Sequence, residues 1–70
     1  MLAGEVLRLL GTALTELPAR QRVVVTLRDV QGLTGDEVCD VLGISAGNQR
    51  VLLHRGRAAL RARLEGYYRA

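Results

Sequence analysis

The stretch TGDEVCDVLGISAGNQRVLLHRGRAALRARL, residues 34–64, contains the signals that decide the fold. Thr34 and Glu37 form a T-x-x-E capping box, in which each side chain satisfies a free backbone N–H of the first helical turn. Gly43 stands where the end of a helix takes positive φ, and Ser45 is a suitable N-cap for the next helix. Two helices joined by a turn of about three residues form a helix-turn-helix, which presents its second helix to the DNA major groove.

Apolar and basic side chains follow separate stripes on these two helices. In the shorter helix, over about 35–42, the apolar stripe is Val38, Val41 and Leu42. The longer helix has two stripes. The basic stripe is Arg50, His54, Arg57 and Arg61. The stripe of apolar and small residues is Leu53, Gly56, Leu60 and Leu64. Gly56 lies within the apolar stripe, so we expect the helix to approach its neighbour closely there.

Two further helices precede this unit. Residues 1–15 have an amphipathic pattern, with Val6, Leu9, Leu10 and Leu14 on the apolar face. Pro18 ends that helix and suits the first turn of the next, which we expect to run to Val30. Its predicted apolar face is Val23, Leu27 and Val30, with Val24 beside them. Leu33 is expected to dock on the core, and residues 66–68 to form a terminal turn. The sequence therefore predicts a compact all-α, four-helix single domain over residues 1–70, with the helix-turn-helix at about 34–64.

The charge is placed unevenly along the 70 residues, whose formal net charge is +3. All ten cations are Arg; residues 50–70 hold six of them against one acid, net +5, whereas residues 1–49 are net −2. A basic C-terminal third on a near-neutral body is the footprint expected of a polyanion-binding protein. The planar guanidinium of Arg can also donate two parallel hydrogen bonds to phosphate or guanine, which the ammonium of Lys cannot.

Several other functions are disfavoured. The single cysteine, Cys39, allows no disulfide within the chain and belongs to no metal-binding pattern, so no metal or cofactor is expected. Asp29, Asp36, Glu37 and Asp40 fit helix capping better than acid–base catalysis, and an enzyme is not expected. We see no signal peptide and no apolar run of about 18 residues. No membrane association is predicted, and a cytoplasmic location is expected.

The segments LPARQRVVVTLRDVQGLTGDEVCDVLGIS (17–45) and LLHRGRAALRARL (52–64) resemble region 4, the C-terminal promoter-binding domain of bacterial extracytoplasmic-function sigma factors of the sigma-70 family. The resemblance implies recognition of double-stranded promoter DNA at the −35 element in the major groove. It also implies docking on the flap of the RNA polymerase core β subunit and, in many members, capture by an anti-sigma factor. A sigma factor needs further domains, so we expect the chain to be part of a longer protein.

The resemblance also implies site residues by position. Base contacts are implied for Asn48, Arg50, Val51, His54 and Arg55, and phosphate contacts for Arg20, Arg28, Arg57 and Arg61. Three positions depart from the family pattern: Gln49 replaces a buried Val, Val51 a small Ser, and Leu52 an Arg. We expect Leu52 to take over the packing of the missing Val, with Gln49 turned to the rim.

Two other functions fit the same sequence. One is the effector domain of another regulator, such as a response regulator, in which dimerisation sets the half-site spacing. The other is a protein-interaction domain without DNA binding, which would use a surface of Leu9, Leu10, Leu14, Val23 and Leu27. Sedimentation and a DNA titration would separate the three, because a dimer favours the first alternative and absent or salt-independent DNA binding favours the second.

Overall fold

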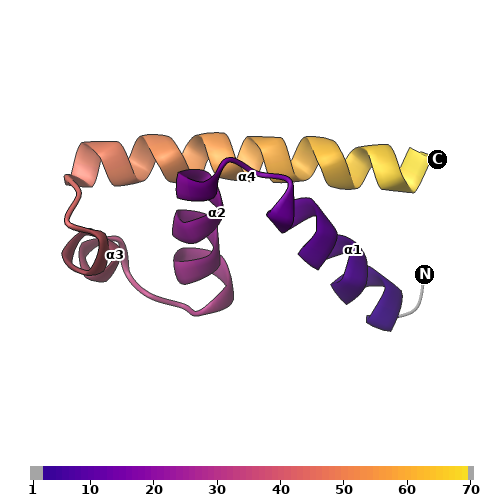
Figure 1. The fold of residues 1–70 in the computed structure, drawn as a ribbon, viewed down its shortest axis with the longest axis horizontal. Coiled ribbons are helices and arrows are strands. Elements are labelled where there is room, and N and C mark those ends of the chain that lie inside the picture. The colour runs from indigo at the N-terminus through magenta and orange to yellow at the C-terminus, as the bar shows by residue number, and fades with distance from the viewer. Residues whose placement is uncertain (1–2, 70) are drawn as a thin grey trace.

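A computed structural model describes residues 3–69, with side chains to residue 67, and the parts of the predictions that fall on Met1, Leu2 and the Tyr68 side chain lie outside the described residues. All regular elements of the described residues are helical, as predicted (Figure 1). Its elements are α1 (Ala3–Thr15), α2 (Ala19–Val25), the π-helical turn η1 (Thr26–Val30), α3 (Gly35–Leu42) and α4 (Ala46–Arg69).

The long helix α4 is the element on which the others pack. Figure 1 shows α4 spanning the molecule, with α3, α2 and α1 arranged in that order along it. The molecule is accordingly elongated, with principal extents of 38 × 19 × 15 Å. At one end, Glu16 anchors the loop after α1 to α4, since its carboxylate accepts hydrogen bonds from Arg63 Nε at 3.2 Å and from the Tyr67 hydroxyl at 2.8 Å.

The core lies where α2, α3 and α4 meet. Val24, Val25, Val38 and Leu53 form its buried cluster. Half-buried or partly exposed aliphatic side chains surround this cluster, namely Leu14, Leu27, Leu33, Ile44, Leu52 and Leu60. The predicted docking of Leu33 and the buried stripe of α4 are thus confirmed. In α1 the face is as predicted for Leu9, Leu10 and Leu14, but the fully buried residue is Ala13, and Val6 is exposed.

The predicted apolar face of the second helix was wrong in part. Val24 and Val25 are buried, whereas Val23 and Val30 are exposed. The π-helical turn contributes to this difference: Gln31 N donates to Thr26 O at 2.9 Å, an i→i+5 bond that widens the turn. Residues seven apart therefore no longer share a face, and the spacing of an ordinary α-helix does not apply to Val30.

The helix-turn-helix has the caps that its sequence predicts. Glu37 N donates to Thr34 Oγ1 at 3.1 Å and Thr34 N donates to Glu37 Oε1 at 2.9 Å, which completes the capping box. Gly43 has φ 66°, the left-handed conformation that ends α3. Asn48 N donates to Ser45 Oγ at 3.1 Å, so Ser45 caps α4. In α3 only Val38 is buried; Val41 and Leu42 face solvent, contrary to the predicted stripe.

The predicted end of the last helix was also wrong. The helix α4 continues through Gly66 and Tyr67 to Arg69 and does not end in a turn near Leu64. The Tyr67 and Arg63 bonds to Glu16 hold this part of α4 against the end of α1. These are tertiary contacts between residues far apart in sequence, and they offset the low helix propensity of Gly66.

Candidate DNA-binding surface

The first half of α4 carries a solvent-exposed face that begins one turn after the Ser45 cap. All five residues for which base contacts are implied lie exposed on it; these are Asn48, Arg50, Val51, His54 and Arg55. Within the described part of the chain, the side chains of Arg50, His54 and Arg55 make no hydrogen bond or ion pair. The structure therefore brings these residues together on one helix with their polar groups available to a ligand.

Arg57 continues this face but is already bound to another residue. Its Nε and Nη2 donate to the two carboxylate oxygens of Asp29, at 2.9 and 2.6 Å, in a bidentate ion pair between α4 and η1. The hydrogen bonds from Arg57 hold the pKa of the Asp29 carboxyl below its usual value, against a smaller opposing effect of burial. The Arg57 side chain is still 47% exposed and keeps N–H groups that Asp29 does not use.

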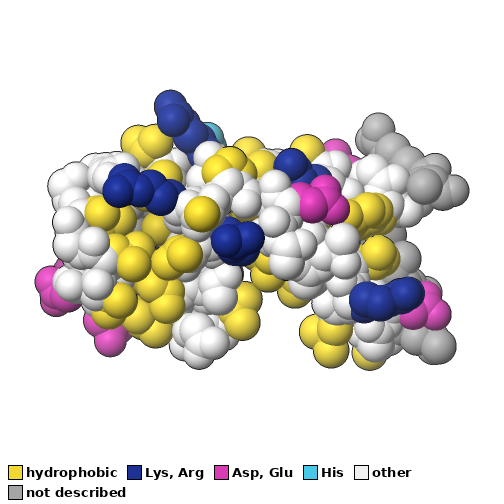
Figure 2. Space-filling view, viewed as in Figure 1, with side chains coloured by type: hydrophobic (Ala, Val, Ile, Leu, Met, Phe, Trp, Pro, Cys, Tyr) yellow, Lys and Arg dark blue, Asp and Glu magenta, His cyan; other side chains and the backbone are white. Residues whose placement is uncertain are grey.

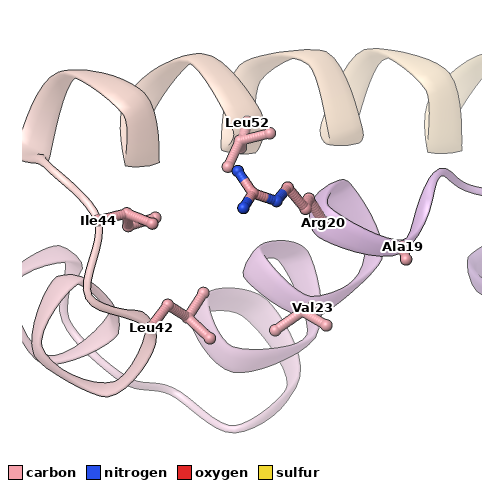
Figure 3. A pocket seen from close by; sticks show the side chains of 6 residues that line it. All are labelled: Ala19, Arg20, Val23, Leu42, Ile44 and Leu52. Atoms are coloured by element: carbon pink, nitrogen blue, oxygen red, sulfur yellow. The ribbon is translucent and has the colours of Figure 1, made fainter.

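The other three residues with implied phosphate contacts lie in different settings. Arg61 is exposed one turn beyond Arg57, on the same side of α4. Arg20 is exposed on α2, with its guanidinium extending toward Leu52 of α4 (Figure 3). Arg28 is half-buried in η1, and its Nε has no hydrogen-bond partner among the described residues. The four arginines therefore do not form one continuous cluster.

The expectation for Gln49 was wrong. Its side chain does not turn to the rim but is buried, with 3% of the residue exposed, directly beneath the exposed face of α4. It fits there because Gly35, the first residue of α3, has no side chain: a Cβ atom on Gly35 would lie 2.5 Å from Gln49 Oε1. Leu52 does pack against the core cluster, as expected, but it does so beside Gln49 and does not replace it.

A second surface, which we call the apolar groove, lies between α2, the turn after α3 and α4. Its walls are Ala19, Arg20, Val23, Leu42, Ile44 and Leu52 (Figure 3), and its volume is about 230 Å³. Figure 2 shows hydrophobic side chains gathered over this part of the molecule, below α4. The exposure of Val23 and Leu42 follows from their place at its edge. The sequence contained a signal for this groove, because α2 and α3 carry more apolar residues than the core buries.

Metal-binding and membrane-spanning features are both missing from the described part of the chain. Among residues 3–69, no group of three or more His, Cys, Asp or Glu side chains is arranged to hold a metal ion. In the same residues, no helix is sufficiently long and apolar to cross a bilayer. Cys39 is half-buried with a free thiol, and its carbonyl accepts the backbone N–H groups of Gly43 and Ile44 at the turn.

The sequence is similar to known proteins over most of its length. The family model described as "Sigma-70, region 4" matches residues 7–60. An ECF RNA polymerase sigma factor, SigE, of Mycolicibacterium smegmatis is 42% identical over 52 residues, which cover 74% of this chain and 20% of the relative. The ECF RNA polymerase sigma factor ShbA of Streptomyces griseus is 44% identical over 52 residues, covering 74% of this chain and 27% of ShbA. The RNA polymerase sigma-E factor of Streptomyces antibioticus is 42% identical over 57 residues, covering 81% and 32%.

These matches confirm the resemblance inferred from the two quoted segments. The matched segment contains the helix-turn-helix and most of α4, but the chain spans only a fifth to a third of the length of these relatives. Region 4 is a non-enzymatic part of transcription initiation factors, in agreement with the expectation that the chain is not an enzyme. The family match and the capped helix-turn-helix lead to one conclusion: the chain belongs to the sigma-70 region 4 family.

Proposed function

We propose that the chain recognises the −35 promoter element as the DNA-binding domain, residues 1–70, of an RNA polymerase sigma factor. The observation that carries the proposal is the exposed, arginine-bearing face of α4, which follows a capped turn in a chain of the sigma-70 region 4 family. A helix in this position of a helix-turn-helix enters the major groove with its N-terminal residues against base edges.

The base contacts are proposed for the residues that share this face. Arg50 and Arg55 have guanidinium groups suited to bidentate bonds with guanine O6 and N7, and Asn48 and His54 offer shorter polar side chains. Val51 is 45% exposed and offers an apolar contact, such as one with a thymine methyl group. These contacts would supply sequence preference, whereas contacts to phosphates would supply most of the affinity.

The phosphate contacts are proposed for Arg20, Arg28, Arg57 and Arg61. Arg61 is the best supported, since it is exposed on the same helix as Arg50 and has no ion-pair partner among the described residues. Arg57 would bind phosphate through the N–H groups that Asp29 leaves unused. Arg28 is the least accessible of the four, because its Nε is buried.

We also propose that the apolar groove is the surface that contacts the flap of the polymerase β subunit. Support comes from its aliphatic walls, which lie on α2, the end of α3, the following turn and Leu52 of α4, and which do not include the five residues proposed for base contacts. Leu42→Ser removes an apolar wall without adding charge beside Arg20, so it should weaken binding to core polymerase and leave the affinity for DNA unchanged. The matched control is Val30→Ser, at an exposed valine that does not line the groove. Equal polymerase binding by both variants would contradict this assignment.

The remaining parts of the proposal are the cellular location and a further partner. We infer a cytoplasmic location from the two proposed partners, promoter DNA and RNA polymerase, and an anti-sigma factor is a further proposed partner. The decisive test selects bound sequences from a random duplex pool with core polymerase present, because we predict weak binding of this chain to −35 DNA alone. A single enriched motif is expected with the parent protein and a relaxed motif with Arg50→Ala. A pool that stays random with the parent would overturn the proposal.

A further inference from the structure

Gln49 is a buried polar residue at the base of the exposed face of α4. Only 3% of it is accessible, although its neighbours Asn48 and Arg50 are exposed. Its side-chain Nε2 has no hydrogen-bond partner among the described residues. A buried amide with unpaired N–H groups destabilises a fold relative to an apolar side chain of the same shape. Stability alone therefore does not account for a Gln at this position.

The amide of Gln49 lies over the backbone of Gly35 and close to Arg28. A Cβ atom on Gly35 would be 2.5 Å from Gln49 Oε1 and 3.0 Å from Arg28 Nη1, so both polar groups occupy the space that glycine leaves open. Arg28 Nε is also buried without a partner among the described residues. At this point η1, the start of α3 and the start of α4 meet through polar atoms, whereas the neighbouring core cluster is built from aliphatic side chains of the same elements.

This contact is well placed to determine the direction of α4. Gln49 is one residue before Arg50 and one turn after the Ser45 cap, at the end of α4 nearest to α3. Because the helix is stiff, a change in the distance between Gln49 and the Gly35 backbone would tilt the face that carries Arg50 and His54. The pocket between these elements is lined by Gln49, Arg28, Gly35 and Arg50, together with Thr34 and Asp36 among others, so a polar head group can stay there whereas an apolar one would move toward the core.

We propose that Gln49 is a positioning residue. The contact of its amide with the Gly35 backbone, beside Arg28, sets the angle between α3 and α4 and thereby determines how Arg50 meets a base edge. The inference rests on the proposed function in one respect, that α4 reads DNA. It goes beyond that function because it assigns sequence selectivity to a buried residue for which no DNA contact is proposed. On this proposal the amide serves the geometry of α4 at the expense of stability.

The test uses Gln49→Met, which keeps the length of the side chain and removes the amide. Backbone residual dipolar couplings in the 70-residue protein report the angle between α3 and α4 without DNA. We expect a changed angle, a higher Tm, and a roughly tenfold loss of preference for the selected duplex over a scrambled one, about the effect of one misplaced bidentate contact. Affinity for the scrambled duplex should not change. Gln31→Met, at an exposed site, is the matched control and should alter none of these quantities.

Two results would overturn the inference: an α3–α4 angle equal to that of the parent, or full selectivity in Gln49→Met. Because Gln49→Met is expected to be more stable than the parent, a loss of selectivity in it cannot be attributed to unfolding. A parent without any sequence preference would refute the proposed function, and the angle would still decide the role of Gln49 in positioning α4.

A second variant tests the contact between the Gln49 amide and Gly35. Gly35→Ala should lower Tm more in the parent than in a Gln49→Ala background, where the amide no longer occupies the space of the new methyl group. Equal losses of Tm in the two backgrounds would show that Gln49 and Gly35 are not coupled, and would overturn the inference.

Discussion

Gly56 is a point of close approach between α4 and α2, and its replacement by Ala tests the packing of the core directly. A Cβ atom there would lie 2.6 Å from Val25 Cγ2 and 3.3 Å from the carbonyl oxygen of Gln21. Val25 is 1% exposed and branched at Cβ, so its short side chain cannot swing out into solvent, and the Gln21 carbonyl is part of the α2 backbone. The helices must therefore separate to admit the methyl group.

The expected loss follows from two opposing effects. Overpacking of a buried site costs about 1–3 kcal/mol, and the tight contact with Val25 places Gly56→Ala in the upper part of that range. The gain in helix propensity from Gly to Ala offsets about 1 kcal/mol. The net destabilisation is thus about 1–2 kcal/mol, which corresponds to a fall in Tm of roughly 4–16 °C for a domain of this size.

Thermal unfolding followed by circular dichroism measures this difference, and α4 itself provides the control. Gly66 lies in the same helix, and a Cβ atom on it would meet none of the described residues within 4 Å beyond its own stretch of helix. Gly66→Ala should therefore raise Tm through propensity alone. If Gly56→Ala were as stable as Gly66→Ala, the close packing of α2 on α4 would be refuted.

Other features of the structure lead to further predictions. Thr34→Ala removes the capping box and should cost about 1 kcal/mol, measured by urea unfolding; an unchanged midpoint would contradict the role of the cap. Gly43→Ala should lower the free energy of unfolding by about 1–2 kcal/mol, because the residue has φ 66°. Its control is Gly47→Ala, at an open site in α4 without positive φ, which should not lower the free energy of unfolding. The pKa of Asp29 is lowered from 3.8 and that of Glu37 from 4.5, so in acid the unfolded state binds more protons and these groups lose their stabilising contribution as the pH falls below those values. Asp29→Asn should reduce the acid dependence of Tm, and an identical pH profile would contradict this assignment. The hydrogen bond to Glu16 raises the pKa of Tyr67 above 10.0, so its contribution is present at neutral pH and is lost as the pH rises beyond the raised pKa; Tyr67→Phe should remove that loss.

The parts of the fold that short-range signals determine could be predicted from the sequence. The capping box of Thr34 and Glu37, the left-handed Gly43 and the Ser45 cap each depend on residues within four positions of one another, and all are present. The close approach at Gly56 was also predictable, because a glycine within an apolar stripe lowers helix propensity and is typical of a site where another helix comes near.

The parts that depend on long-range packing could not be predicted in this way. Three consecutive valines, 23–25, have similar propensities, and only the position of α4 decides that the last two are buried. The partner of Arg57 is 28 residues away, so no local pattern indicates that Asp29 binds it. Gln49 was expected at the rim because Leu52 was expected to supply the packing in its place, and the burial of Gln49 depends on the space that Gly35 leaves on another helix. The same holds for the end of α4, which the contacts with Glu16 extend.

The central claim is that the exposed face of α4 reads DNA sequence through Arg50 and binds the backbone through Arg61. Fluorescence anisotropy with a selected and a scrambled duplex, at several salt concentrations, tests both roles. Arg50→Ala should reduce the preference for the selected duplex, with a loss of about 1–3 kcal/mol of discrimination. Arg61→Ala should weaken both equally and lower the slope of log K against log salt by about 0.9. If both variants bound both duplexes as the parent does, α4 would not be the recognition helix.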